Sequence, residues 1–195
     1  MTFGKAFALN KTDLSVVSEG FPSPNVNEEL VAYARDIKVV ISKNAGAPGN
    51  GGGDSSASEG GFLLDVWKRN ALWKSINLAD VDLHGIVYTD TEFGGIAIDE
   101  TGRKIAYIAE EKKPKNTPYF KPSPKEETLA GHESRYREEW GEQMVGKANQ
   151  VIVVVDLETE EFMVHSEKLP ADVLPGQLTW YENALYGVAV KTKPY

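Results

Sequence analysis

Three histidines are the side chains whose ordinary pKa suits proton transfer near neutral pH: His84, His132 and His165. They lie in different segments, and none is near a strand-to-helix turn that could hold a nucleophilic serine. His84 precedes Gly85, which favours a turn, and His132 lies in a charged segment. His165 follows the alternation of an expected strand, which places it on the surface or between strands. We expect all three to have structural rather than catalytic roles.

The closest approach to a nucleophilic serine motif is at residues 56–60, which read Ser-Ala-Ser-Glu-Gly. Serine hydrolysis on an α/β sheet uses Gly-x-Ser-x-Gly at a sharp turn from strand into helix. It also needs a histidine oriented by a carboxylate. The stretch lacks the first glycine of that motif and belongs to a glycine-rich segment with no helical pattern after it. We interpret it as a linker and expect no catalytic serine.

Metal and nucleotide sites have sequence signatures that this chain lacks. It has no cysteine, no His-x-x-x-His pair and no Asp-x-Asp-x-Asp-Gly loop. The glycines of residues 46–61 fit neither Gly-x-Gly-x-x-Gly nor a loop ending in Gly-Lys-Ser/Thr. The neighbouring acids Glu110-Glu111 and Glu138-Glu139 would point to opposite faces of a strand, so we expect solvated charges. We predict no catalytic, cofactor-binding or metal-binding residues, and no cofactor.

The charge balance excludes some classes of partner. The chain has 29 Asp and Glu against 21 Lys and Arg, a net charge of −8, which disfavours binding to phosphate backbones. Its densest basic run, Lys112, Lys113 and Lys115, lies among acids and prolines. No stretch approaches the ~20 apolar residues of a membrane span, and residues 1–10 do not resemble a signal peptide. We expect a cytoplasmic protein without nucleic-acid or membrane contacts, and we interpret the sequon at Asn10 as chance.

Short β-branched and aromatic runs separated by polar turns predict an all-β protein. A glycine- and serine-rich segment, 44–61, separates two of these runs and is expected to be a long hairpin loop. Residues 1–28 are mixed: 7–14 suggest a short strand, 21–24 a proline-containing loop, and 27–30 a helical turn. The main expected strands are 37–42, 62–67, 72–78, 93–98, 104–109, 150–155, 161–165, 177–181 and 185–190.

A weak internal repeat indicates which all-β fold is present. The pair of runs in 94–109 resembles the pair in 175–190, and two further runs, 150–155 and 161–165, lie between them. Four antiparallel strands followed by a restart are typical of β-propeller blades. The repeat is longer than an ordinary blade because of an insertion, 111–149. We predict a partial propeller of four-stranded blades, about one and a half to two.

The insertion combines two kinds of sequence. Residues 112–127 are rich in Lys and Pro and are expected to form an extended loop. Residues 128–147 could form a short helix, since Tyr136, Trp140 and Met144 recur at four-residue spacing. Two interpretations stay open: a solvated excursion held by its aromatic residues, or a binding or assembly arm.

Several segments together resemble acylaminoacyl-peptidases, also called acylpeptide hydrolases, of the prolyl-oligopeptidase clan. The resemblance runs through residues 62–67, 72–78, 84–90 and 104–115. It continues through Arg137-Glu-Glu-Trp-Gly-Glu142, Val155-Asp156 and Pro175-Gly-Gln-Leu-Thr-Trp180. It covers about residues 29–195, and the order of the segments and the position of the insertion carry it.

The resemblance implies a non-catalytic part of a two-domain protein. In that family a propeller covers a serine hydrolase domain that removes N-acylated amino acids from blocked peptides, and the propeller limits access to short peptides. We expect residues 1–28 to be an N-terminal segment, 29–195 a partial propeller, and the hydrolase domain to be absent.

The expected partners are the remainder of a hydrolase chain or other copies of this chain. Short N-acylated peptides are expected to bind only where a hydrolase domain is present. The alternative is a stand-alone interaction module that binds partners through its insertion; a small metal or nucleotide enzyme has no ligand pattern to support it.

Overall fold

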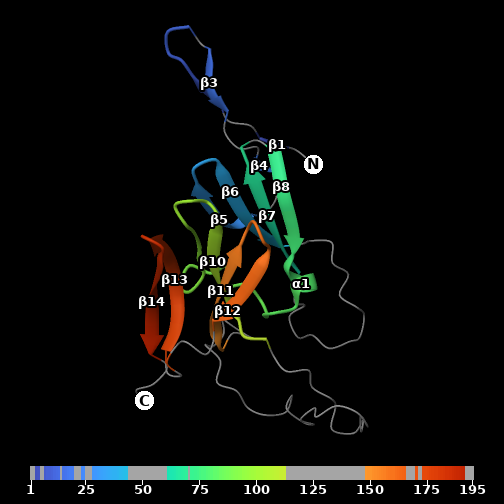
Figure 1. The fold of residues 1–195 in the computed structure, drawn as a ribbon, viewed down its shortest axis with the longest axis vertical. Coiled ribbons are helices and arrows are strands. Elements are labelled where there is room, and N and C mark those ends of the chain that lie inside the picture. Colours follow the sequence, from blue (N-terminus) through green and yellow to red (C-terminus); the bar gives the residue numbers. More distant parts are fainter. Residues whose placement is uncertain are drawn as a thin grey trace.

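Antiparallel strands form nearly all of the regular structure (Figure 1). The computed structural model describes residues 3–4, 7–13, 15–19, 23–24, 28–43, 61–69, 71–112, 148–165, 170 and 173–191. Within these residues no helix is both long and apolar enough to cross a membrane.

The first sheet consists of four consecutive strands in the order β5-β6-β7-β8. Their bounds are Glu28–Ala34, Ile37–Lys43, Phe62–Lys68 and Ala71–Asn77. Lys43 pairs with Phe62, so the glycine-rich segment joins two neighbouring antiparallel strands, which confirms the long hairpin connection. The helical turn expected at 27–30 is wrong, because Glu28 and Leu30 pair with β6.

A single helical turn, α1 (Leu78–Val81), follows the first sheet. The Asn77 side chain accepts a hydrogen bond from the Ala79 N–H, which satisfies a free donor at the start of the turn. Asp82 ends the turn in the left-handed region, with φ of 51°. The strand expected at 72–78 therefore stops one residue earlier, because the Asn77 cap turns the chain out of the sheet.

The second sheet repeats the pattern in the order β9-β10-β11-β12. Its strands span Ile96–Ile98, Lys104–Glu110, Gln150–Asp156 and Glu161–His165. β10 and β11 pair over their full length, from Lys104 opposite Asp156 to Glu110 opposite Gln150. The insertion thus leaves and re-enters the sheet between its second and third strands, as the sequence predicts.

A two-stranded sheet follows, formed by β13 (Val173–Tyr181) and β14 (Ala184–Lys191). A β-bulge at Gln177 interrupts its register. Nearer the N-terminus, β2 (Phe7–Leu9) pairs with β3 (Val16–Glu19), and β1 (Phe3–Gly4) pairs with β4 (Ser23–Pro24). The last pairing corrects the expectation of a loop at 21–24, because Ser23 and Pro24 lie opposite β1.

The three larger sheets are arranged like successive propeller blades. The first strand of each contacts the first strand of the next: β5 packs near β9, and β9 near β13. The remaining strands follow outward in chain order. Among the described residues, two four-stranded sheets are followed by one sheet of two strands. The expected one and a half to two blades correspond to the two four-stranded sheets, and the pair β13-β14 adds to them. The described strands do not close a ring.

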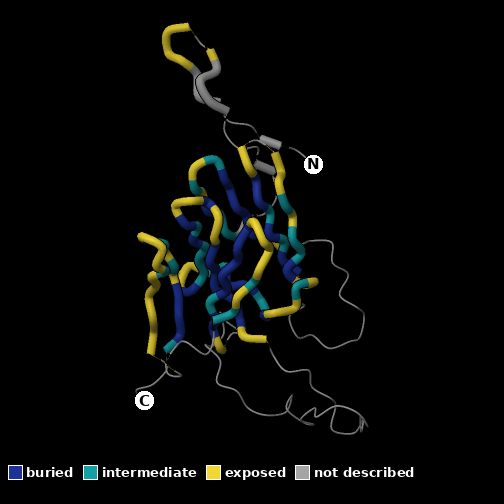
Figure 2. Tube along the Cα trace, viewed as in Figure 1, coloured by how far each residue is buried: buried dark blue, intermediate teal, exposed yellow. Residues whose placement is uncertain are grey.

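The main hydrophobic core lies between the first and second sheets (Figure 2). Side chains alternate across a strand with a period of two, so every second residue of the central strands enters this core. Its members from those strands are Ile37, Val39, Ile41, Phe62, Leu64, Val66, Ile105, Tyr107, Ala109, Val151, Val153 and Val155.

A second, smaller core lies on the other face of the second sheet. Tyr88, Phe93 and Ile108 form it, with Ile152 and Leu178 packed against them. Leu178 belongs to β13, so this core joins the second sheet to the two-stranded sheet. Its small size follows from the two strands that the third sheet provides.

Truncation of a core leucine tests the assignment of the main core. Leu64 is fully buried, and Leu64→Ala should lower the free energy of unfolding by about 2–5 kcal/mol through lost burial and the cavity left behind. The matched control is Leu72→Ala on the next strand, where the side chain is 49% exposed. Chemical denaturation of both variants checks the difference, and equal losses would contradict the assignment.

Candidate functional site

The first group of buried polar side chains lies on β10 and in the segment before β9 that contacts it. His84 is buried and contacts Tyr107 edge-on, with the ring centroids 5.4 Å apart. Its Nε2 lies 2.7 Å from the Tyr107 hydroxyl, and its Nδ1 lies 2.9 Å from the carbonyl oxygen of Gly85. A carbonyl oxygen only accepts, so Nδ1 donates to it and Nε2 accepts from the Tyr107 hydroxyl.

Burial controls the ionisation of this pair. It lowers the pKa of His84, although the hydrogen bond to the Gly85 carbonyl acts in the opposite direction. Burial also raises the pKa of Tyr107 far above its ordinary range. Both groups are therefore neutral near pH 7. Because both ring nitrogens of His84 are engaged, the geometry favours a structural role over proton transfer.

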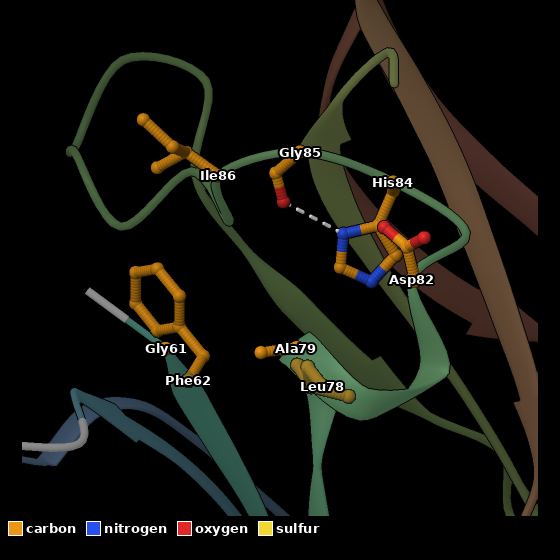
Figure 3. Close-up of a pocket in the computed structure, with 8 residues that line it drawn as sticks. All are labelled: Gly61, Phe62, Leu78, Ala79, Asp82, His84, Gly85 and Ile86. Atoms are coloured by element: carbon orange, nitrogen blue, oxygen red, sulfur yellow. Dashed lines mark hydrogen bonds between the residues drawn. The ribbon is translucent and has the colours of Figure 1, made fainter. Parts of the chain in front are cut away.

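A cavity of about 140 Å³ lies beside His84 (Figure 3). The cavity is lined by the start of β7, by α1 and by the segment that leads to β9. Apolar side chains from Phe62, Leu78 and Ile86 contribute to its wall, and Asp82 lies next to the histidine. Lys112 forms an ion pair with Asp82 at 2.7 Å, which connects the cavity rim to the beginning of the insertion.

Glu110 is a buried carboxylate at the end of β10, with 4% of its surface exposed. The Tyr88 hydroxyl donates to its Oε2 at 2.7 Å. The backbone N–H groups of Ala148 and Asn149 also donate to the carboxylate, at 3.0 and 3.2 Å. The expectation of a solvated charge is therefore wrong for Glu110: three donors from two other segments satisfy it inside the protein.

Glu110 and Glu111 together fix the neck of the insertion, defined here as residues 111–112 and 148–149. The N–H of Glu111 donates to the carbonyl of Asn149 at 2.8 Å, and the Asn149 side-chain amide donates to the Glu111 carboxylate at 3.2 Å. Glu111 itself is exposed, as expected for one member of an alternating pair. The insertion therefore starts and ends at a hydrogen-bonded junction.

Tyr88 connects this neck to the second core. Its pKa is raised well beyond the ordinary range, chiefly by burial and then by the bond to Glu110. The nearby Gln150 side chain acts to lower the pKa of Tyr88. Neither the nitrogen nor the oxygen of the Gln150 amide has a well-formed hydrogen bond. Tyr88 also contacts Phe93 edge-on within the second core. One side chain thus links the insertion neck to the packing of β13.

The tight turns at the opposite end of the second sheet are held by carboxylates. Asp99 accepts bonds from the N–H groups of Arg103 and Lys104, and Asp156 accepts from the Arg103 side chain. Desolvation acts to raise the pKa of Asp156, but hydrogen bonds from the backbone N–H groups of Glu158 and Thr159, and then from Arg103, hold it below its ordinary value. An open cavity of about 380 Å³ lies between these turns and Trp180. Backbone N–H groups of the turns satisfy Asp99, and the Arg103 guanidinium pairs with Asp156, so these carboxylates stabilise the turns.

The other residues considered for chemistry lie apart. His165 is half-buried at the end of β12, opposite Ile152, as its alternation predicts. His132, Ser56, Ser58 and the pair Glu138-Glu139 lie outside the described residues. Within the part of the chain that is described, no three His, Asp or Glu side chains cluster as metal ligands would. The predicted lack of catalytic, cofactor and metal residues stays a prediction.

Sequence reasoning missed the roles of Glu110 and Tyr107. Each looked like an ordinary strand residue, and their partners are 22 to 39 residues away in the chain. The one available signal was Glu110 itself, a charged residue that directly follows the apolar run 105–109.

A comparison with known proteins identifies the family of this chain. A family model described as "Acylamino-acid-releasing enzyme, N-terminal domain" matches residues 53–186, which contain the second sheet, both cores' central strands β7, β10 and β11, and the insertion. The chain belongs to the acylamino-acid-releasing enzyme family. The resemblance inferred from its sequence segments is thereby confirmed.

Curated relatives named acylamino-acid-releasing enzyme are similar over most of this chain. The Mus musculus protein is 33% identical over 144 residues, covering 66% of this chain and 19% of that protein. The Homo sapiens protein is 32% identical over 159 residues, covering 74% and 20%. The Arabidopsis thaliana protein is 30% identical over 129 residues, covering 62% and 17%. The chain spans about a fifth of the length of the relatives it matches.

The buried histidine of this family member should make its stability depend on pH. Because burial lowers the pKa of His84, the unfolded chain binds the proton at higher pH than the folded chain. The stabilisation is complete above the ordinary pKa of about 6.5 and is lost as pH falls toward the lowered one, by at most about 1.4 kcal/mol per pH unit.

Denaturation curves between pH 7.5 and 5 measure this effect. The wild-type chain should lose more stability on acidification than His84→Gln, which cannot take up the proton. His165→Gln, at a half-buried strand position, serves as the control. Parallel pH profiles for wild type and His84→Gln would contradict the assignment.

Substitution of the two neighbouring glutamates tests the insertion neck. Glu110→Gln leaves fewer acceptor positions for three buried donors and should lower the free energy of unfolding by about 1–3 kcal/mol. It should also speed hydrogen exchange at the amides of Ala148 and Asn149. Glu111→Gln makes the same charge change on an exposed side chain and should leave both quantities close to wild type. Equal effects of the two substitutions would disprove the distinction.

Proposed function

We propose that this chain is the non-catalytic N-terminal propeller portion of an acylaminoacyl-peptidase-like serine hydrolase. In this role it serves substrate-size gating and assembly, while a separate hydrolase domain releases N-acyl amino acids from blocked peptides. The match of residues 53–186 to the N-terminal domain of the family, over consecutive blade-like sheets, carries the proposal. A cytoplasmic location belongs to the same proposal, since a chain without cysteine suits a reducing compartment.

The order of the strands supports gating. β5, β9 and β13 are the first strands of their sheets and contact one another in sequence, so they occupy the innermost positions of the blades. The innermost strands of a propeller surround its central channel. A channel of fixed width admits an extended short peptide and excludes folded chains. The rigid packing of the first two sheets through the main core suits a wall of fixed width.

The two-stranded sheet is less buried than the first two sheets, and this difference supports a role in assembly. The main core buries one face of the first sheet and one face of the second. The two-stranded sheet instead leaves large apolar side chains of β14 in contact with solvent. An apolar strand of this kind is typical of a surface that meets another polypeptide. We propose that the remainder of a hydrolase chain or another copy of this chain provides the contact.

A chimaera tests the catalytic and gating parts together. In it, the 144 aligned residues of the Mus musculus relative are replaced by those of this chain. The isolated chain should release no nitroaniline from acetyl-alanine nitroanilide, because it supplies no nucleophile. The chimaera should hydrolyse that substrate and should retain the parent's preference for short over long N-acetylated peptides, measured as the ratio of kcat/KM values.

Two results would count against the proposal. Hydrolysis by the isolated chain above a heat-inactivated control would overturn its non-catalytic role. A folded, active chimaera that treats short and long peptides alike would overturn the gating role of this region. The matched control is the parent protein carrying its own segment through the same cloning steps.

A further inference from the structure

The cavity beside His84 combines an apolar wall with one charged group at its rim (Figure 3). Phe62 and Leu78 are buried, Ile86 is half-buried, and all three line the cavity. Apart from the histidine, Asp82 is the only ionisable residue among the described lining residues. Its side chain is 61% exposed, so the carboxylate lies where the cavity meets solvent.

The volume of the cavity limits the size of an apolar group that enters it. It measures about 140 Å³. An apolar cavity of about 150 Å³ in another protein binds benzene. The space therefore holds one ring or one branched alkyl group, about the size of a single Leu, Ile or Phe side chain. Burial of such a group supplies binding free energy in proportion to the apolar area removed from water.

The charge at the cavity favours a cationic ligand group. His84 donates from Nδ1 to the Gly85 carbonyl and accepts at Nε2 from the Tyr107 hydroxyl, so both of its nitrogens are engaged. The Asp82 carboxylate is negative and pairs with Lys112 at 2.7 Å. The Lys112 side chain is 41% exposed, and an exposed ion pair of this kind is weak enough to be shared or replaced. A primary ammonium group is therefore the ligand group that suits the rim.

The short distance between rim and wall narrows the ligand further. Asp82 and the apolar side chains line one small cavity, so the ammonium and the apolar group of a ligand must be separated by few bonds. In the first residue of a peptide, the α-ammonium and the side chain are attached to the same carbon. In a lysine side chain, the ammonium ends an unbranched chain and no apolar group lies beyond it. An amino-terminal residue therefore fits better than a lysine.

We propose that this cavity binds the free amino terminus of a peptide whose first residue is apolar. The side chain of that residue enters between Phe62, Leu78 and Ile86, and its α-ammonium donates to the Asp82 carboxylate. An N-acylated terminus lacks the charge and carries an additional group, so the site rejects it. The remainder of the peptide leaves through the open rim beside Asp82 and the exposed Ala79.

The place of the cavity in the fold suits a binding site. Phe62 lies opposite Lys43, where the chain re-enters the first sheet after the glycine-rich segment. Lys112, in the neck of the insertion, contacts the rim at Asp82. The cavity thus lies where both long connections of the sheets start or end. Connections that a rigid sheet holds in place are common positions for recognition.

The ligand class also agrees with the reaction in the proposed function. Removal of an N-acyl amino acid from a blocked peptide leaves a peptide with a free amino terminus. In that role the cavity holds the product peptide and rejects the blocked substrate. Only this connection rests on the proposed function, because binding of a peptide by the chain itself requires no hydrolase domain.

Titration of the isotope-labelled, full 195-residue chain with dipeptide amides tests the ligand class. Leu-Gly amide should cause saturable NMR shifts at the backbone amides of Leu78, Ala79 and Ile86, at millimolar concentration. Its N-acetylated form lacks the charge and should bind at least about tenfold more weakly. Gly-Gly amide keeps the charge but lacks the apolar group, and it should also bind at least about tenfold more weakly.

A pair of aspartate variants tests the role of the rim. Asp82 has a left-handed backbone, with φ of 51°, which Asn also tolerates. Asp82→Asn should therefore keep the backbone, remove the charge and weaken the binding of Leu-Gly amide about tenfold. The matched control is Asp36→Asn, which removes a carboxylate that pairs with Arg69 away from the cavity. It should leave the affinity unchanged.

A pair of isoleucine variants tests the wall. Ile86 and Ile98 are both half-buried and packed against the main core, but only Ile86 lines the cavity. Ile86→Ala should weaken the binding of Leu-Gly amide about fivefold through lost apolar contact. Ile98→Ala should leave the affinity unchanged. Circular dichroism verifies that each variant retains its strand content.

Distinct results overturn the inference. Equal binding of the free and acetylated dipeptides, or equal binding by wild type and Asp82→Asn, would exclude recognition of the ammonium. Absence of saturable shifts at the cavity, or an affinity unaffected by Ile86→Ala, would exclude the site. The gating and catalytic parts of the proposed function succeed or fail separately, because none of these titrations uses a hydrolase domain.

Discussion

The fold is organised around the packing of the first sheet against the second. Every second residue of β6, β7, β10 and β11 enters one continuous apolar layer, and most are fully buried. Burial of large aliphatic and aromatic side chains is the main source of folding free energy. This layer also holds together strand pairs that are separated in the chain by a glycine-rich segment and by a 39-residue insertion. The sheets can tolerate these long connections because the apolar faces, rather than the loops, determine which strands meet.

Two polar groups are buried at the edge of this apolar layer and need hydrogen-bond partners there. Tyr107 enters the core with its hydroxyl, and Glu110 ends the same strand with its carboxylate in a buried position. A buried polar group without a partner is costly, so each must be satisfied locally. His84 meets the first need, while Tyr88 and two backbone N–H groups meet the second. The segment that leads to β9 and the neck of the insertion are thereby fixed relative to β10. We interpret this network as the support that fixes the neck of the insertion, residues 111–112 and 148–149, on the second sheet.

The third sheet shows the consequence of fewer strands. It meets the second sheet through a core of three buried residues and two partly buried ones, against fifteen buried residues in the main core. The large apolar residues of β14 consequently stay in contact with solvent, where the corresponding strands of the first two sheets are buried (Figure 2).

The local strand pattern can be predicted from the amino-acid sequence alone. Alternating apolar residues in runs such as 104–109 and 150–155, with polar turns between them, specify strands, because a period of two places one face in the core. They also specify the four-strand repeat and the place of the insertion. Predictions from local sequence were wrong where a segment pairs with a distant strand. A helical turn was expected at 27–30, but Glu28 and Leu30 pair with β6. A loop was expected at 21–24, but Ser23 and Pro24 pair with β1.

The roles of the buried polar residues depend on contacts that form when the sheets pack together. Glu110 resembles a solvated charge in the sequence because its three donors come from Tyr88, Ala148 and Asn149, all distant in the chain. His84 resembles a simple turn residue until Tyr107 is brought to its ring by the second sheet. A hydrogen bond between remote segments leaves no periodic trace in a sequence. Its geometry is fixed by the packing of whole sheets, and that packing is a property of the folded chain.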